Sequence, residues 1–372
     1  CCCRPQTRGG RCAPCPSVIM WSIGNEIPEQ GTLDGVDIAK SLVEMCHEMD
    51  PTRMVTSACD CIAASSGATL HAFEEALDVV GYNYVDRWRE RAETQYDEDR
   101  RLFPGRRFVG TENASAGGER GIYSPRDGIR SDRADYTIWT HRHEWLWRYM
   151  ASRDFAAGDY LWTGIDYLGE CGWPRRGSSS GPIDSAGFPK DTYYYFRSIW
   201  NTKETTLHIV PHWNWPGKEG EYIPVIVYTN CDRVDLYINN RKVGMKACGA
   251  PYYGAVRSWN DPRKETTTHD LHLTFDVVYE PGVLRAVGYR NGTAVTEETV
   301  RTTGGPAALR AAADCSVMKA GDMCDLSLYS APERRMFSGR LMAMIRAEAA
   351  GEILVRFSSE GMEPVLVTIK AE

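Results

Sequence analysis

The sequence lacks any long uninterrupted apolar run: nowhere do about 18 apolar residues, the length of a membrane-spanning helix, follow one another without a charge. It also lacks a basic excess, because 43 Lys and Arg stand against 50 Asp and Glu and leave a formal charge of −7. A nucleic acid or an anionic membrane surface attracts clustered Lys and Arg. We therefore expect neither a nucleic acid nor a membrane as a partner.

A regular cysteine framework is missing as well. Five of the 13 cysteines fall within the first fifteen residues, and the other eight are scattered without even spacing. A chain of this length has little need of disulfides, so we expect free thiols and a reducing, cytoplasmic compartment. Cys12 and Cys15 have zinc-knuckle spacing, but no second Cys or His pair completes four ligands. Residues 1–16, which lack the apolar centre of a signal peptide, are expected to form an irregular tail.

Histidine is scarce, with 8 residues in the chain. Two close pairs, His141 with His143 and His269 with His272, are not completed to a metal site by an acid or a cysteine at a suitable spacing. We expect these side chains to be exposed to solvent or packed against a sheet.

Between Ser17 and about Leu168, short apolar runs alternate with longer amphipathic stretches, a pattern typical of parallel strands joined by helices. Apolar residues at helical spacing predict a helix from Asp34 to Asp50, which is followed by Pro51, and a second helix over Arg133–Arg153. The predicted buried strands are Ser17–Ile23, Arg53–Ala58, Leu77–Tyr84, Arg107–Thr111 and Asp159–Ile165.

Beyond Trp200 the pattern changes to alternating residues interrupted by turns, which is typical of antiparallel β-sandwich modules. A boundary near Asn201 and a hinge at Gly304-Gly305-Pro306 separate an α/β part from the all-β parts. The predicted strands are Tyr222–Thr229, Val234–Asn239, Leu271–Tyr279, Val283–Tyr289, Ile353–Phe357 and Val365–Ile369.

Glutamates directly follow two of the predicted parallel strands. Glu26 ends the run Ser22-Ile23-Gly24-Asn25-Glu26, and Glu112 follows Val109-Gly110-Thr111. In βα folds the carboxyl ends of the strands meet at one mouth, where the chemistry lies. Glycoside hydrolysis needs one carboxylic acid that protonates the leaving oxygen and a second group that acts across the sugar. The two glutamates are therefore candidates for a glycosidase pair, although strand-end glutamates also serve as surface caps or ion-pair partners.

The motif WSIGNE, followed about 86 residues later by VGTEN and then by LWTGIDYLGE and GFPKDTYYYFRSIW, resembles glycoside hydrolase family 2, the β-galactosidase group. The resemblance extends through LHIVPHWNWPGKEGEYIPVIVYTNCDRVDLYINNRKVG, which is similar to the β-sandwich that follows the barrel in many bacterial members, and reaches from Pro16 to about Thr303. It implies a retaining glycoside hydrolase that cleaves terminal β-D-galactosides through a covalent glycosyl-enzyme intermediate.

Carried over residue by residue, the resemblance implies Glu26 as general acid/base and Glu112 as nucleophile. Asn25 would hydrogen-bond the sugar 2-hydroxyl, with a strand-end cap as the alternative. Tyr84 would hydrogen-bond the nucleophile, and Trp162 would form the platform beneath the sugar; core packing is the alternative for both.

Other residues in the matching motifs are expected to support the barrel rim rather than to take part in catalysis. They are Asp166, Glu170, Lys190 and Asp191. Trp213 and Trp215, at the start of the first sandwich, either touch an outer sugar or only join the two domains.

The expected fold is α/β plus all-β: a partial (β/α)8 TIM barrel with strands four to eight, followed by immunoglobulin-like β-sandwich modules. The expected parts are the tail at 1–16, the C-terminal part of the barrel at 17–203, a β-sandwich domain at 204–303 and a shortened immunoglobulin-like module at 304–372. Family members carry a jelly-roll domain, an immunoglobulin-like domain and three further barrel strands before the first motif. We therefore interpret this chain as a truncated or frameshifted gene product. We expect the isolated chain to be inactive, poorly folded or aggregation-prone.

Two alternatives stay open. β-Glucuronidase shares both Glu motifs but adds an Asn-x-Lys pair for the uronate carboxylate, and the absence of that pair from Gly181–Lys190 favours a neutral sugar. The chain could also be a non-catalytic carbohydrate-binding remnant, which would bind sugar without turnover. We predict no cofactor, although some family members use Mg²⁺ or Na⁺ near the site; no ligands can be assigned here, and a homo-oligomer is left open.

Overall fold

The structure is a computed structural model that describes residues 17–60, 68–85, 94–115, 118–123, 138–169, 177–247, 271–313, 315–320, 336 and 339–372. The predicted tail 1–16 lies outside the described residues, as do Glu170 and His269.

Five parallel strands form the first sheet, in the order β1-β2-β3-β4-β5, as the alternating pattern predicts. The strands are β1 Met20–Asn25, β2 Met54–Cys59, β3 Val79–Asn83, β4 Phe108–Asn113 and β5 Asp159–Leu161. Each overlaps its predicted range. The last strand ends earlier than the predicted Ile165, because Ile165 instead forms an isolated bridge with Ile183.

Helices cover one side of this sheet. They are α1 Leu33–Met49, α2 His71–Glu75, α3 Gln95–Leu102 and α4 Ile138–Ala151, with a short 3₁₀ turn, η1, at Pro28–Gly31. The first helix begins where the Thr32 side chain accepts a hydrogen bond from Gly35 N at 3.1 Å, and it ends before Pro51 as predicted. Its buried face contains Val36, Ala39 and Val43.

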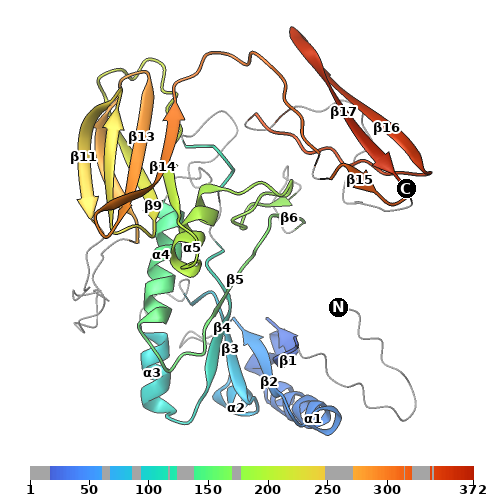
Figure 1. The fold of residues 1–372 in the computed structure, drawn as a ribbon. Helices are drawn as coiled ribbons and strands as arrows, with labels where there is room; N and C mark the ends of the chain where they lie inside the picture. The colour runs from blue at the N-terminus through green and yellow to red at the C-terminus, as the bar shows by residue number, and fades with distance from the viewer. Residues whose placement is uncertain are drawn as a thin grey trace.

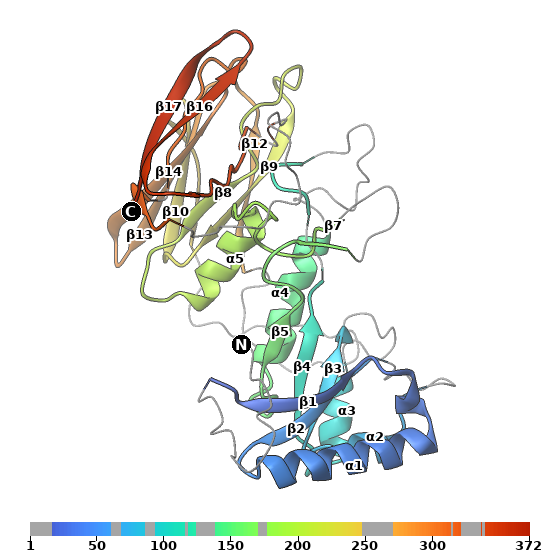
Figure 2. The same ribbon diagram turned by 90° about the vertical axis from the view of Figure 1, so that its right-hand side faces the viewer.

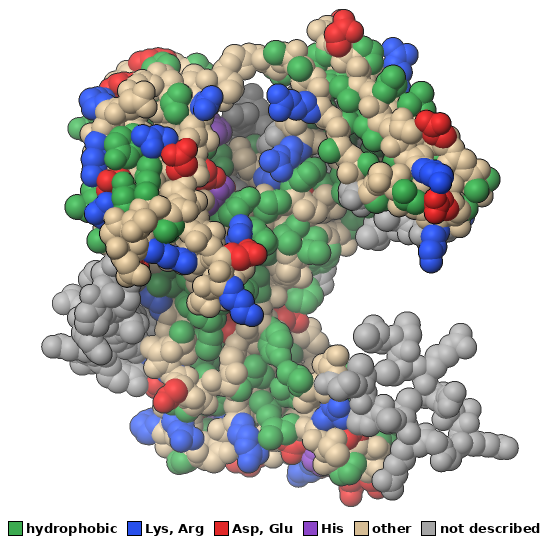
Figure 3. All heavy atoms as spheres, in the orientation of Figure 1, with side chains coloured by type: hydrophobic (Ala, Val, Ile, Leu, Met, Phe, Trp, Pro, Cys, Tyr) green, Lys and Arg blue, Asp and Glu red, His purple; other side chains and the backbone are tan. Residues whose placement is uncertain are grey.

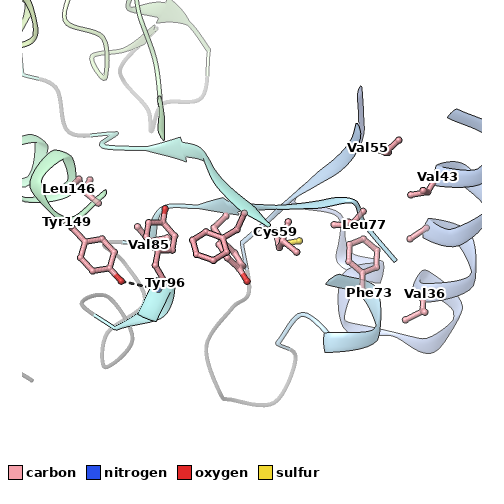
Figure 4. Close-up of a cluster of buried hydrophobic side chains, with 14 of the residues drawn as sticks. Val36, Val43, Val55, Cys59, Phe73, Leu77, Val85, Tyr96, Leu146 and Tyr149 are labelled. Carbon is pink, nitrogen blue, oxygen red and sulfur yellow. Dashed lines mark hydrogen bonds between the residues drawn. The ribbon is translucent and has the colours of Figure 1, made fainter. Parts of the chain in front are cut away.

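The apolar cluster between these helices and the sheet is continuous from α1 to α4 (Figure 4). At its centre the rings of Tyr96 and Phe108 stack at 4.9 Å, and Tyr149 stacks on Tyr96 at 5.2 Å. Tyr82 belongs to this cluster, so its neighbours along β3, Gly81 and Asn83, lie on the opposite face of the sheet. That opposite face carries the candidate site.

A second body consists of two antiparallel sheets that share one core. One sheet has the order β11-β10-β13-β14 and the other β12-β9-β8. The strands are β8 Leu207–Val210, β9 Tyr222–Thr229, β10 Arg233–Ile238, β11 Arg241–Ala247, β12 Leu273–Val278, β13 Val283–Arg290 and β14 Thr293–Arg301. Sequence patterns missed β8, β11 and β14. In β11 the alternation is weak because its side chains are exposed or only half-buried.

Helix α5, Asp191–Trp200, joins the two bodies. Tyr195 and Phe196 pack in one buried cluster with Val210 of β8 and Tyr228 of β9. A small hairpin of β6, Tyr167–Leu168, and β7, Gly177–Ser178, precedes the helix. In Figure 2 the arrows of β3 and β4 point toward the side on which α5 and the two-sheet body lie, so the carboxyl ends of the strands face that body.

The last part of the chain forms a separate sheet, β15-β17-β16, with strands β15 Val317–Met318, β16 Gly351–Ser359 and β17 Met362–Ala371. Figure 1 shows the β16–β17 hairpin standing apart from the other sheets. This part contacts the rest of the protein through Arg340, whose guanidinium lies 5.2 Å from the centre of the Phe188 ring.

Among the described residues, no helix is long and apolar enough to cross a membrane. Acidic and basic side chains are interspersed over the face shown in Figure 3 rather than gathered into one basic area. This distribution agrees with the formal charge of −7.

Candidate functional site

Three of the parallel strands end in the same way at one edge of the sheet. Strands β1, β3 and β4 each finish with an asparagine, and the next residue has a left-handed backbone: Glu26 at φ 49°, Tyr84 at φ 53° and Ala114 at φ 55°. Residues other than glycine rarely adopt this region, and each costs about 1–3 kcal/mol. The strand ends also carry irregularities of register, which re-aim side chains.

The Glu26 side chain is held by the end of β3. Asn83 Nδ2 donates to Glu26 Oε1 at 3.0 Å and to Asn25 Oδ1 at 3.2 Å. The Glu26 backbone N donates to Ala58 O at 2.9 Å, which fixes the residue against β2. Glu26 and Asn25 are exposed, so both are open to a ligand.

The Glu112 side chain is held by Tyr84, the residue that follows Asn83. Tyr84 donates its hydroxyl hydrogen to Glu112 Oε2 at 2.8 Å, and Tyr84 N donates to Glu112 O at 2.6 Å. Two consecutive residues, Asn83 at the end of β3 and Tyr84 directly after it, thus each bind one of the candidate glutamates. A hydroxyl that donates to a carboxylate favours its ionised form.

Asn113 supports this arrangement from β4. It is fully buried; its Oδ1 accepts from Val85 N at 2.9 Å, and its Nδ2 donates to Asp159 Oδ1 at 2.6 Å. The backbone that carries Tyr84 is therefore tied to β4, and β4 is tied to β5.

Trp162 directly follows β5, and its backbone N donates to Asn113 O at 2.9 Å. Its indole Nε1 donates to the hydroxyl of Tyr167 at 3.1 Å, and the two rings meet edge to face at 5.7 Å. The ring is half-buried at the same edge of the sheet as the glutamates. All five sequence-predicted site residues therefore lie at the carboxyl ends of the strands.

The predicted rim residue Asp166, which is half-buried, forms an ion pair with the buried Lys190, whose Nζ lies 2.8 Å from Asp166 Oδ1 and donates also to Ser179 O at 3.0 Å. Gly181 N donates to the same carboxylate oxygen at 2.9 Å. Burial raises the pKa of Asp166 to about 6, although Lys190 opposes the rise. These contacts brace the loop between Trp162 and α5.

Asp191 braces the boundary with the two-sheet body. Its Oδ1 lies 2.6 Å from His208 Nε2, and its Oδ2 accepts from the Tyr123 hydroxyl at 2.6 Å. Burial alone lowers the pKa of His208, but hydrogen bonds to Asp191 and Glu298 and their charges outweigh it and raise the pKa to about 9. The described carboxylates on either side of this imidazole therefore keep it protonated.

Trp213 and Trp215, which follow β8, pack in or against the core of the two-sheet body. Trp213 is fully buried in the core between the two sheets and donates its Nε1 hydrogen to Glu280 O at 3.0 Å. Trp215 packs against the same core, and the centre of its indole ring lies 4.7 Å from the centre of the His212 imidazole ring. Both rings thus belong to the core of the two-sheet body itself, which is neither a contact with a sugar nor a junction between the two domains.

No group of three or more His, Cys, Asp or Glu that could hold a metal ion occurs among the residues that the structure describes. His272 lies 2.6 Å from Glu144 in a buried pair, and His143 is buried against Phe196. His143 therefore packs against helix α5 rather than against a sheet, and His272 has an acidic partner that the sequence pattern did not predict.

Sequence reasoning missed Asn83, Thr111 and Asn113 as site residues. Asn83 and Asn113 each end a strand beside a predicted site residue, and this repeated strand-end asparagine was an available signal.

Comparison with known proteins finds family models that match two parts of the chain. Residues 11–168 match the TIM barrel domain of glycosyl hydrolases family 2, and residues 220–296 match a domain of unknown function, DUF4982. The β-galactosidase BoGH2A of Bacteroides ovatus is 32% identical over 376 residues, 86% of this chain and 40% of that protein. A β-glucuronidase of Formosa agariphila is 29% identical over 167 residues, 44% of this chain and 15% of that protein.

A solved β-glycosidase from Bacteroides vulgatus has a similar fold, with a TM-score of 0.69 at 24% identity, over 95% of this chain and 51% of that one. Residues 11–168 thus belong to the TIM barrel domain of glycosyl hydrolase family 2, and the resemblance seen in the sequence motifs is confirmed. The chain spans 40% of the length of the Bacteroides ovatus relative and about half of the solved β-glycosidase.

Proposed function

We propose that the protein is a retaining glycoside hydrolase that cleaves terminal β-D-galactosides through a covalent glycosyl-enzyme intermediate. The observation that carries this proposal is the binding of Glu26 by Asn83 and of Glu112 by Tyr84, because consecutive residues hold two carboxyl groups at one edge of the sheet. A retaining mechanism requires such a pair, with the carboxyl groups roughly 5 to 5.5 Å apart across the anomeric carbon.

In the proposed reaction Glu26 donates its proton to the glycosidic oxygen while the bond from that oxygen to the anomeric carbon breaks. The ionised Glu112 forms a bond to the anomeric carbon from the opposite face, and the alcohol leaves. Water then attacks the same carbon, gives its proton to Glu26 and releases Glu112 as a carboxylate. The hydrogen bond from Tyr84 supports this role of Glu112 because it stabilises the negative charge that must attack.

Asn25 and Trp162 are proposed to hold the sugar. An amide at the position of Asn25 can donate to the hydroxyl beside the anomeric carbon, a contact that strengthens in the oxocarbenium-like transition state. The Trp162 indole is anchored through Tyr167, so one ring face can be presented to the apolar C–H face of a galactose unit.

The preference for a neutral galactoside is supported by the state of Lys190. Its side chain is 0% exposed and paired with Asp166, so it is not available to bind a uronate carboxylate. The relative that covers most of this chain among those described above is a β-galactosidase. β-Glucuronidase, the name of another relative, is the competing activity.

We further propose that residues 17–203 are the C-terminal part of the barrel, with β1 to β5 as its strands four to eight. Residues 204–303 would then be an immunoglobulin-like sandwich domain, and 304–372 a shortened module of the same class. The supporting observations are the parallel order of β1 to β5 and the shared core of the two sheets that follow.

A dinitrophenyl β-galactoside with fluorine beside the anomeric carbon tests the reaction class, because the fluorine slows the second step and traps the intermediate. Mass spectrometry of peptides should find one fluorosugar on Glu112 of the purified protein. The Glu112→Gln variant should carry none, and the corresponding fluoroglucuronide should label far less. Labelling of another residue, or preferential labelling by the glucuronide, contradicts the proposal.

A further inference from the structure

A buried amide, that of Asn83, contacts two of the proposed site residues at once. We propose that Asn83 is a positioning residue that determines which oxygen of Glu26 carries the catalytic proton and which end of the Asn25 amide meets the sugar, and that Thr111 fixes Asn83 in turn. This inference rests on the proposed glycosidase function and deepens it.

The Asn83 side chain is completely buried, and its Nδ2 lies 3.0 Å from Glu26 Oε1 and 3.2 Å from Asn25 Oδ1. A side-chain amide has two N–H hydrogens. One hydrogen can therefore point to each of these oxygens, and the same nitrogen sets the position of both neighbouring side chains.

Thr111 determines the orientation of the amide. Its hydroxyl donates to Asn83 Oδ1 at 2.7 Å. A flipped amide would place Asn83 Oδ1 against Glu26 Oε1 and Asn25 Oδ1, which are both acceptors, and would lose the Thr111 bond unless that hydroxyl turned. The hydroxyl of Thr111 thus keeps the N–H groups directed at the site.

This arrangement has a direct consequence for proton transfer. Asn83 donates an N–H hydrogen to Glu26 Oε1, and a proton on the same oxygen would be directed against that hydrogen. The acidic proton of Glu26 is therefore carried by Oε2. In the proposed reaction Oε2 donates to the leaving oxygen and later accepts the proton of the attacking water. Since Asn25 Oδ1 is also engaged by Asn83, its Nδ2 is the end that can donate to a sugar hydroxyl.

Two local features of the backbone accompany this contact. The β3–β4 register shifts between Tyr82 and Asn83, at the last residue of the strand. A Cβ atom at Gly81 would lie 2.8 Å from Thr111 Cγ2, closer than real side chains approach, so glycine there leaves the space in which Thr111 reaches Asn83.

The test compares two substrates that differ in their need for an acid. The dinitrophenolate of a dinitrophenyl β-galactoside leaves without being protonated. The methoxide of methyl β-galactoside must receive a proton as it leaves. We expect Asn83→Asp and Thr111→Val to lower kcat/KM, which reports the first step of the reaction, about 10- to 100-fold on methyl β-galactoside while changing kcat/KM on the dinitrophenyl substrate less than about threefold. Thr111→Ser keeps the hydroxyl, and its kcat/KM should stay close to that of the wild type on both substrates. Glu26→Gln should lose kcat/KM on methyl β-galactoside selectively, as the other two variants do, but by a larger factor.

Thr111→Val preserves the shape of the side chain, so it keeps the test decisive if Asn83→Asp is unstable; circular dichroism and unfolding midpoints identify folded variants. Equal losses on the two substrates, or no loss at all in folded Thr111→Val, overturn the positioning role while leaving the glycosidase function in place. A Glu26→Gln variant without selective loss overturns the proposed function and this inference together, as does a wild-type protein that hydrolyses neither substrate.

Discussion

A protonated His208 links α5 to the two-sheet body, and we expect its removal to weaken the protein in a pH-dependent way. Its Nε2 lies 2.6 Å from Asp191 Oδ1, and its Nδ1 lies 3.0 Å from Glu298 Oε1. The ring also stacks on Tyr194 at 3.8 Å, and Glu298 accepts in addition from Ile209 N. One imidazolium therefore joins a helix of the first body to two strands of the second.

The magnitude follows from the rise in the pKa of His208 from 6.5 to about 9. At about 1.4 kcal/mol for each pKa unit, the folded protein gains on the order of 3 kcal/mol from holding this proton. The unfolded chain holds it less tightly, so the stabilisation is complete below about pH 6.5 and is lost as the pH rises through about pH 9. His208→Gln cannot carry the charge, and its deficit in unfolding free energy should shrink by that amount across this window.

Urea unfolding at several pH values, followed by tryptophan fluorescence and circular dichroism, measures this deficit. His71→Gln is the matched control, because His71 lies 2.9 Å from Glu74 but its side chain is 60% exposed, and such pairs contribute only about 0–1 kcal/mol. A deficit of His208→Gln that stays constant from about pH 6.5 to about pH 9 would refute the reasoning.

Three further substitutions test the site and its rim. Tyr84→Phe removes the donor to Glu112 and should lower kcat on a nitrophenyl β-galactoside about 10- to 100-fold with an unchanged unfolding midpoint; an unaltered kcat counts against the contact. Trp162→Ala should raise KM for the galactoside about tenfold, whereas Trp162→Phe retains a ring and should raise it less; equal effects would exclude the ring as a platform. Lys190→Met should cost about 3–5 kcal/mol in urea unfolding because Asp166 stays buried without its partner, and a loss below about 1 kcal/mol would contradict that role.

The first sheet was predictable from sequence because its strands read as short apolar runs. The central strands β2, β3 and β4 are mostly buried, as predicted, whereas the outer strands β1 and β5 are only half-buried or exposed. The positions of Glu26 and Glu112 at strand ends follow from the same runs, since each glutamate comes directly after one of them. The roles of Tyr84 and Trp162 depend instead on resemblance to a family, because spacing alone does not distinguish a site aromatic from a packed one.

The contacts of Asn83 were beyond the reach of sequence patterns. They join residues from three strands and depend on register shifts at the strand ends, and a shift of one residue turns a side chain to the other face. Periodicity cannot locate such a shift. The pairing of His208 with Glu298 likewise depends on β8 lying against β14, and neither strand has a pattern strong enough to be predicted.

The central claim is that Glu26 and Glu112 act as a pair on a β-galactoside. The most direct measurement is the release of nitrophenol from a panel of aryl β-glycosides by the purified protein, run beside Glu26→Gln and Glu112→Gln. We predict turnover of the β-galactoside that falls by at least about 100-fold in both variants, with folding unchanged. A folded protein that binds the sugar without turnover, or turnover that survives in either variant, would contradict the account.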